Sequence, residues 1–273
     1  MTISIVIIAR NEEKRIGRTL KTLQKQTLRP DEVIVVDNAS TDSTAEIARK
    51  FGATVVYEPV TIRGKAQNTG ILASTGEFIG LIGADYVLDR NWLKILYQRV
   101  SGDKGISGAS ASILALNRDK LLPYLMELAS QPPRLGNAMM MYRREPLFKA
   151  GLYNPRLHNA EDVELALRVL NMGYRIVHEP RAIVYHPYPE KLSPILNRQF
   201  EYGYWNMKAK KGSGTLGRKD WLIMIAFPFI FLKHLPKIKT HPLLPIFLTL
   251  STYAYTIGMW RGLTSEGTRC REG

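Results

Sequence analysis

Polar and acidic residues follow three of the apolar runs in the first 85 residues. Asn11 and Glu12 come after the first run, Asp37 closes the second, and Asp85 follows the fourth. Carboxylate oxygens are ligands that hard divalent cations prefer, and diphosphate oxygens can complete their coordination. In open α/β sheets, ligands bind just outside the carboxyl ends of the strands. Asp85 is therefore predicted to hold a metal ion at such an edge.

Alternating strands and helices must position these residues. Strands buried on both faces are indicated by four apolar runs, 3–9, 32–37, 53–57 and 78–84. Helices are predicted between them, and this alternation indicates an α/β protein with a doubly wound, mostly parallel sheet. Right-handed crossovers would place the strand ends on one edge, so Asp37 and Asp85 are expected to share it.

Shorter elements are predicted in the rest of the chain. Helices are expected over 89–101, 117–129 and 144–150, and strands over 105–113, 138–142, 174–177 and 182–185. Ser40, Thr41 and Asn159 are predicted helix caps. Glycines are expected to end helices at positions 52, 151 and 173. The helix that Asn159 begins is predicted to bury Val163, Ala166, Leu167 and Leu170.

Composition and charge limit the classes of protein that the chain can form. Its 273 residues, 45% hydrophobic and 23% charged, suffice for one large α/β domain and an appendage. The net charge is +14, and residues 191–273 carry 13 Lys or Arg against 4 Asp or Glu. This excess favours an anionic partner, either nucleic acid or a membrane surface, over a merely solvated basic face. The single cysteine, Cys270, excludes an internal disulfide and a cysteine-based zinc site. We also expect no signal peptide.

The ordered set of motifs resembles family 2 glycosyltransferases, which have the GT-A fold. The three strand ends resemble the nucleotide-binding half of that family, and residues 63–77 are similar to its intervening helix. Residues 136–145 resemble its small-residue loop and Arg-Arg-Glu helix start, and 159–168 resemble its Glu-Asp helix. The resemblance covers about residues 3–190. It implies an inverting, hexosyltransferase-type enzyme that uses a nucleotide-diphosphate sugar and Mg²⁺ or Mn²⁺.

The resemblance also implies roles for individual residues. Ala9, Asn11 and Glu12 lie in the turn that contacts base and ribose, and Asp37 would hydrogen-bond the base. Asp162 is the implied catalytic base.

The metal motif of the family is Asp-x-Asp, which here reads Gly83-Ala84-Asp85. Gly83 cannot ligate a metal, so Asp85 is predicted as the main carboxylate ligand, with help from His186. Metal affinity without nucleotide is then expected to be weak.

Structural alternatives remain open for each of these residues. Asp162 would suit the first turn of a helix whatever its chemistry. Asp37 could make a local turn, Lys65 could be a solvated charge rather than a phosphate contact, and His186 could be purely structural. Two further basic residues, Arg143 and Arg144, could clamp phosphate or lie at the surface.

The last third of the chain combines apolar runs with basic residues. Residues 221–232 and 242–260 carry no charge, and the longer run nearly reaches the roughly 20 residues that a spanning helix needs. Trp260, Lys239 and Arg261 at its ends suit interfacial anchoring. We predict a membrane-associated helical region, in which the apolar runs either span the bilayer, with a transmembrane helix over 242–260, or lie in its interface. The alternative is a soluble helical cap.

Two domains are therefore predicted. Residues 1–190 form the catalytic domain, with a nucleotide-binding half over 1–100 and an acceptor half over 101–190, and residues 191–273 form the membrane-associated region. A lipid-linked or polysaccharide acceptor at the cytoplasmic face of the cell membrane is expected. The aromatic and basic stretch 197–212 has the composition of a nucleic-acid binder. The adjoining apolar runs favour the membrane instead, so no nucleic-acid partner is expected.

Two other functions compete with this interpretation. A sugar-nucleotide pyrophosphorylase needs a glycine-rich, basic turn after the first strand, whereas residues 9–13 contain two acids and no glycine. A non-catalytic sugar-nucleotide-binding or scaffold protein would tolerate Gly83 in the metal motif. Metal-dependent turnover of a nucleotide sugar separates that protein from an enzyme.

Overall fold

The computed structural model describes residues 2–130, 139–157, 161–213, 217–225 and 234–265. Four predicted features lie wholly or partly outside these ranges: the loop at 136–137, the cap Asn159, the apolar run 221–232 and Cys270. The chain forms two compact units. The N-terminal unit comprises residues 1–118 and 130–187, and the C-terminal unit comprises 119–129 and 188–273. Residues 119–129 lie within the range predicted for the first domain.

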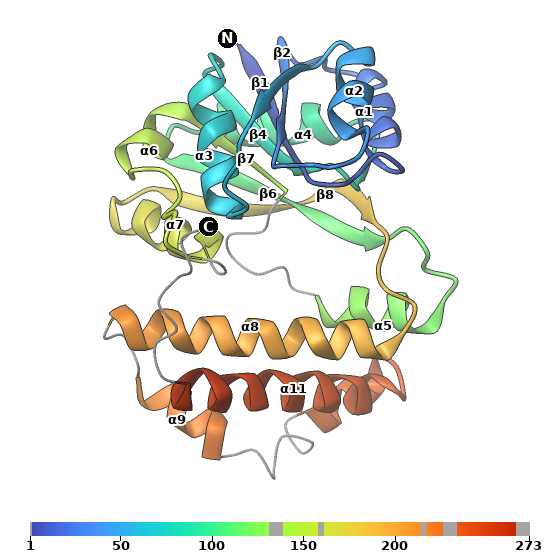
Figure 1. Ribbon diagram of the computed structural model, residues 1–273, viewed down its shortest axis with the longest axis vertical. Coiled ribbons are helices and arrows are strands. Elements are labelled where there is room, and N and C mark those ends of the chain that lie inside the picture. The colour runs from blue at the N-terminus through green and yellow to red at the C-terminus, as the bar shows by residue number, and fades with distance from the viewer. Residues whose placement is uncertain (1, 131–138, 158–160, 214–216, 226–233, 266–273) are drawn as a thin grey trace. The chain divides into compact units, whose positions relative to one another are not determined.

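An eight-stranded sheet forms the centre of the N-terminal unit, in the order β3-β2-β1-β4-β7-β6-β8-β5 (Figure 1). The first four of these strands are mutually parallel, β4 and β7 are antiparallel, and β6 and β8 are again parallel. The predicted α/β, mostly parallel sheet is therefore confirmed. The strand bounds are β1 Ile3–Ala9, β2 Glu32–Asp37, β3 Thr54–Tyr57, β4 Phe78–Gly83, β5 Val87–Leu88, β6 Ile106–Ala115, β7 Met140–Arg143 and β8 Arg175–His186.

The strand register brings the chemical residues to one edge. Ala9 at the end of β1 pairs with Asp37 at the end of β2, and the neighbouring Ile8 pairs with Gly83 at the end of β4. The last residue of β8, His186, pairs with Ala115 at the end of β6. Because these strands run in the same direction, the loops that follow them leave the sheet at a common carboxyl edge.

Helices cover both faces of the sheet (Figure 1). Helices α1, α2 and α4 pack on one face around Ile5, Ile7 and Trp92, and α3, α6 and α7 pack on the other around Val6, Ile34 and Tyr142. Their bounds are α1 Ile16–Gln24, α2 Thr44–Lys50, α3 Arg63–Ala73, α4 Trp92–Ser101, α6 Arg144–Lys149 and α7 Glu161–Asn171. Gly52, Gly151 and Gly173 have φ of 81°, 83° and 84°, which confirms their predicted positions at helix ends.

Several local predictions were wrong. Helix α7 buries Glu161, Leu165, Ala166 and Val169 and exposes Val163 and Leu167, so its core face is rotated from the prediction. The buried Glu161 carboxylate defines this face, and an apolar count overlooks it. The two short strands predicted within 174–185 are one strand, β8, because register shifts let it continue past Pro180.

The C-terminal unit is helical. It contains α5 Leu121–Ala129, α8 Leu192–Ser213, α9 Arg218–Ile225, the 3₁₀ helix η2 Leu235–Lys239 and α11 Leu244–Thr264. Helices α8 and α11 lie side by side (Figure 1). A Cβ atom on Gly203 would overlap the carbonyl oxygen of Tyr255, and one on Gly258 would overlap that of Phe200. Glycine therefore permits the close approach of these two backbones.

None of the helices in the described part of the chain is both long enough and apolar enough to cross a bilayer. The predicted transmembrane helix over 242–260 corresponds to α11 and is wrong for that helix. Hydroxyl residues distributed through α11 lower its mean hydropathy, namely Thr249, Ser251, Thr252 and Thr256.

Candidate active site

The loops after β1 and β2 are locked together. The Asn11 amide donates to Ser40 Oγ at 3.0 Å, and Asn11 Oδ1 accepts from the Thr41 amide at 2.8 Å. Asn11 and Ala39 have positive φ values of 54° and 56°, a conformation that non-glycine residues rarely adopt. The predicted capping role of Ser40 and Thr41 is wrong, because α2 begins at Thr44 and these residues brace the first loop instead. The backbone strain at Asn11 and Ala39 is typical of sites where a ligand needs a fixed backbone.

Asp37 and Ala9 are buried beneath these loops. Asp37 Oδ1 accepts from the Ser40 amide at 3.1 Å, which is the local turn that the sequence left as an alternative role. The carbonyl oxygen of Ala9 accepts from the Asn38 amide at 2.8 Å. Ala9 is therefore placed to support the loops rather than to present a side chain.

Lys65 is held at the same edge by a carboxylate that the sequence analysis missed. Glu58, which follows β3, lies with its Oε1 3.5 Å from Lys65 Nζ and accepts from Thr69 Oγ1 at 2.6 Å. Burial raises the pKa of the Glu58 carboxyl. The hydrogen bonds from Thr69 and the Val60 amide and the charge of Lys65 outweigh burial, so the net pKa is lowered. Lys65 is thus an oriented cation rather than a freely solvated one.

Asp85 and His186 meet at the carboxyl edge of the sheet although they lie far apart in the sequence. Their Oδ2 and Nε2 atoms are 3.1 Å apart. The two-residue strand β5, which the sequence analysis missed, pairs with β8 through Val87 and Tyr185 and so fixes both residues. Burial raises the pKa of Asp85, but the hydrogen bond and charge of His186 outweigh it and lower the net pKa. Asp85 is therefore ionised at neutral pH.

Other side chains crowd the same corner. Burial and the nearby Asp85 charge raise the pKa of Glu12, although its hydrogen bond to Arg15 opposes them. The carbonyl oxygen of Ala84 accepts from Thr19 Oγ1 at 2.7 Å, and its side chain is buried. The Tyr86 ring lies 4.7 Å from the His186 ring, centroid to centroid.

Gly83 leaves room for the tyrosine ring. A Cβ at position 83 would lie 3.0 Å from Tyr86 Cε2 and 3.1 Å from Asp85 Oδ1. These separations are shorter than ordinary van der Waals contacts. A larger residue at this position would press on both Tyr86 and Asp85.

Asp85 Oδ2 and His186 Nε2 could both bind one divalent cation, which would take the place of the hydrogen bond between them. Ligands about 2.1 Å from an octahedral ion and adjacent to each other are about 3 Å apart, which is close to the observed 3.1 Å. Among the described residues, no group of three or more His, Cys, Asp and Glu side chains could hold a metal. A divalent cation held by Asp85 and His186 would need further ligands, which diphosphate and water oxygens could supply, as Mg²⁺ sites commonly arrange.

Asp162 belongs to a second cluster, at the start of α7. Its neighbour Glu161 is almost fully buried, with its Oε1 3.7 Å from Arg63 Nε at the start of α3. Beneath them the Asn68 side chain clamps the backbone of Tyr153, with Nδ2 2.8 Å from its carbonyl oxygen and Oδ1 2.9 Å from its amide nitrogen. The Arg63–Glu161 pair thereby links α7 to α3, and Asn68 of α3 holds Tyr153 in the segment that precedes α7.

The environment of Asp162 favours its protonated form. Burial is the largest cause and the charge of Glu161 the next, and together they raise the pKa of Asp162 to about 6 against the opposing charge of Arg63. A carboxyl group with a pKa near 6 is ionised at neutral pH and still a useful proton acceptor.

Arg143 and Arg144 do not lie at this edge. Arg143 pairs with Phe78 at the start of β4, and its Nη2 donates to the carbonyl oxygen of Val100 at 2.6 Å. Arg144 donates to the carbonyl oxygen of Ser74 at 2.8 Å. The suggested phosphate clamp is therefore wrong, and both guanidinium groups cap ends of helices.

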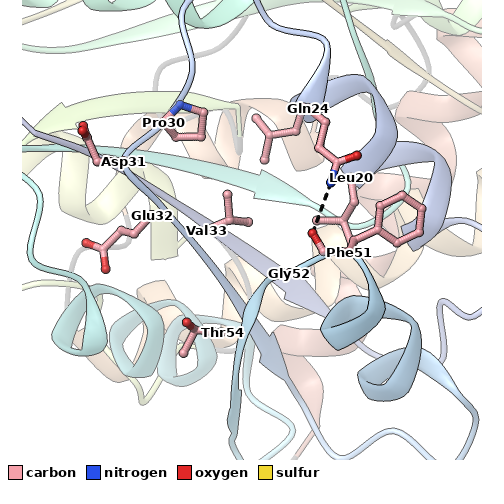
Figure 2. A pocket seen from close by; sticks show the side chains of 10 residues that line it. Leu20, Gln24, Pro30, Asp31, Glu32, Val33, Phe51, Gly52 and Thr54 are labelled. Atoms are coloured by element: carbon pink, nitrogen blue, oxygen red, sulfur yellow. Dashed lines mark hydrogen bonds between the residues drawn. The ribbon is translucent and has the colours of Figure 1, made fainter.

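A pocket of about 300 Å³ lies at the opposite edge of the sheet (Figure 2). It is formed by α1, the start of β2 and the turn after α2, and Gln24 within it donates to the carbonyl oxygen of Phe51 at 3.2 Å. Glu32 is already engaged by the Thr75 amide at 2.6 Å. The pocket is remote from the carboxyl edge and is not part of the candidate site.

Four residues at the site were missed by sequence reasoning: Glu58, Arg63, Tyr86 and Glu161. Glu58 follows β3 directly, so the rule that ligands gather at carboxyl ends could have found it. Glu161 adjoins Asp162 in the sequence. Arg63 and Tyr86 become visible only through contacts across the fold.

Comparison with known proteins agrees with this geometry. The family model for glycosyl transferase family 2 matches residues 4–148, just over half of the chain. Glycosyltransferase AglE of Haloferax volcanii is 25% identical over 224 residues, which cover 74% of this chain and 71% of that protein.

Two solved structures are similar in fold. Mannosyltransferase PcManGT from Pyrobaculum calidifontis, in complex with GDP-Man and Mn²⁺, has a TM-score of 0.69 at 19% identity and covers 96% of this chain and 87% of its own. Glucosyl-3-phosphoglycerate synthase from Mycobacterium tuberculosis, in complex with Mn²⁺, UDP-glucose and phosphoglyceric acid, has a TM-score of 0.53 at 22% identity. The similarity covers 74% of this chain and 76% of the synthase chain.

Proposed function

The chain belongs to glycosyl transferase family 2, and on this premise we propose that it transfers a sugar, with inversion, from a nucleoside diphosphate sugar to an acceptor hydroxyl. A divalent metal, Mg²⁺ or Mn²⁺, serves as cofactor. Asp85 and His186 hold the metal, and Asp162 is the general base.

The observation that carries this proposal is the meeting of Asp85 and His186 at 3.1 Å on the carboxyl edge. An ionised carboxylate beside an imidazole provides two ligands, and the diphosphate of the donor provides others. When bound, the metal neutralises charge that develops on the departing diphosphate. Lys65 is proposed to contact the same diphosphate, since Glu58 orients its ammonium group at this edge.

The loops that carry Asn11, Glu12 and Asp37 are proposed to bind the base and ribose. Their mutual hydrogen bonds and two positive φ values support a preformed nucleotide site. A preformed site loses little conformational freedom on binding, which favours affinity. Ala9 and Ala84 contribute through their backbone, because both side chains are buried.

Asp162 is proposed to take the proton from the acceptor hydroxyl as that oxygen attacks the anomeric carbon. The C–O bond to the diphosphate breaks as the new glycosidic bond forms, so a single displacement inverts the configuration. Base catalysis of this kind typically contributes roughly 10²–10⁴-fold to the rate. The raised pKa of Asp162, about 6, supports the role because the group is ionised yet basic at neutral pH.

The acceptor and the location are proposed from the C-terminal unit. Its basic and apolar composition supports a lipid-linked or polysaccharide acceptor at the cytoplasmic face of the cell membrane.

A donor screen tests the proposal. The melting temperature of the full chain is measured with UDP-, GDP-, ADP- and dTDP-sugars, each with and without Mn²⁺. We expect one nucleotide to stabilise the protein, and only when metal is present. Asp85→Asn should abolish that shift. Asp119→Asn, which changes an exposed aspartate of the C-terminal unit, should retain it. Failure of every donor to shift the melting temperature would refute the proposed site.

A further inference from the structure

Helix α11 presents an apolar face to solvent. Its five large exposed side chains retain 39–51% of their accessible surface, and they are Leu243, Ile246, Leu250, Ile257 and Trp260. Intervals of three, four and seven residues place them on one side of a helix with 3.6 residues per turn. We call these five residues the α11 stripe.

The stripe is separate from the contacts that build the C-terminal unit. Gly258 and Gly262 on α11 approach the backbone of α8, and Phe247 packs with Leu125 of α5 and Ile195 of α8. The large apolar side chains of the α11 stripe are therefore left outside the packing of the unit. An exposed apolar patch of this kind marks a site of contact with a membrane or another molecule.

Basic side chains flank the stripe. Lys237 and Lys239 are exposed in η2, next to the exposed Leu235 and Ile238, and Arg261 is exposed beside Trp260. Residues 221–265 contain no Asp or Glu. The charged side chains within residues 234–265 are thus all basic, complementary to an anionic surface.

We propose that the α11 stripe, with the lysines of η2, docks the protein on the surface of an anionic membrane without crossing it. Apolar side chains and a tryptophan would enter the headgroup boundary, while the cations attract anionic lipids. This binding mode needs no spanning helix. Such docking would account for the proposed membrane location, and it does not depend on catalysis.

Vesicle sedimentation with the full chain tests this docking surface. The probes are vesicles of phosphatidylcholine alone and vesicles that also contain phosphatidylglycerol, with no sugar nucleotide present. We expect sedimentation with the anionic vesicles only, weakened by salt because screening reduces the attraction of exposed charges. Absence of a sugar donor makes the result independent of the proposed reaction.

Variants at exposed positions locate the binding surface. The double variant Ile246→Gln/Ile257→Gln should weaken binding at least about tenfold, since two exposed apolar side chains that would enter the membrane are lost. Lys237→Gln/Lys239→Gln should weaken it roughly 25-fold, about fivefold for each cation near the surface. Control variants in the N-terminal unit, Leu72→Gln on α3 and Lys94→Gln on α4, also change exposed residues and should bind as the unaltered chain does. Circular dichroism checks that every variant is folded.

Three results would overturn the proposal. The unaltered chain could fail to sediment with anionic vesicles, or the stripe variants could bind as tightly as the controls. The stripe variants could also turn an oligomer into a monomer in gel filtration while vesicle binding persists, which would assign the stripe to a second copy of the chain.

Discussion

Replacement of Asp162 by asparagine should stabilise the protein while it removes the proposed base. Folding raises the pKa of this carboxyl from 3.8 to about 6, chiefly through burial. The folded state therefore binds the proton more tightly than the unfolded state does. Stability is highest below the unfolded pKa, falls as pH rises through the window from 3.8 to about 6, and is constant above it.

The size of this effect follows from the shift. Two units at 1.36 kcal/mol each give ~3 kcal/mol of stability lost above the window, of which ~2 kcal/mol is lost between about pH 4.5 and pH 8. An asparagine side chain cannot ionise, so the Asp162→Asn variant should gain ~2 kcal/mol over the unaltered chain across that interval. The test is how much the stability difference between variant and unaltered chain changes with pH, rather than the size of that difference at any one pH.

Urea unfolding at several pH values, followed by circular dichroism, measures this difference. Glu164→Gln is the matched control, since Glu164 lies in the first turn of the same helix and pairs with Arg168 at 2.7 Å. Its stability difference should be ~0.5 kcal/mol and should change little over the same range. If the Asp162→Asn difference is equally flat with pH, the assigned environment of Asp162 is wrong.

Three further outcomes are expected. The rate of sugar transfer should rise with pH to a plateau above about 6, as Asp162 ionises, and a rate that falls through this range would exclude Asp162 as the base. Gly83→Ala should destabilise the fold by ~1–3 kcal/mol in urea unfolding, because the added methyl group meets Tyr86 and Asp85 at 3.0 and 3.1 Å. The second change Tyr86→Ala should relieve part of that loss, and an unchanged loss would point to another cause. Gly258→Val should loosen the α8–α11 pair and increase proteolysis of the C-terminal unit, whereas Ala254→Val, at a partly exposed position of α11, should not.

The parallel strands β1 to β4 could be predicted from the sequence because their signals are local. Continuous β-branched runs identify buried parallel strands, and the right-handed crossover rule then brings Asp37 and Asp85 to one edge. The meeting of Asp85 with His186 required more. It depends on β5, whose two residues are too few to produce a pattern, and on the long β8, which a proline and register shifts disguise as two strands.

The burial of polar side chains explains why other features of the fold and the site could not be predicted from the sequence. Helix α7 faces the core with Glu161, which an apolar pattern does not include. The apolar periodicity therefore predicts the wrong core face and places the exposed Leu167 in it. The Glu58–Lys65 and Arg63–Glu161 pairs join segments whose proximity depends on the packing of α3. The length of the apolar run in α11 indicates a possible bilayer span, but with its hydroxyl residues the helix is not apolar enough to cross one.

Turnover of a nucleoside diphosphate sugar tests the central claim most directly. Release of nucleoside diphosphate is measured for the stabilising donor with Mn²⁺, with metal removed by a chelator, and for the Asp85→Asn and Asp162→Asn variants. We predict metal-dependent release, a loss of donor affinity in Asp85→Asn, and a roughly 10²–10⁴-fold lower rate with retained donor binding in Asp162→Asn. Release that persists without metal, or an Asp162→Asn variant as fast as the unaltered chain, would contradict it.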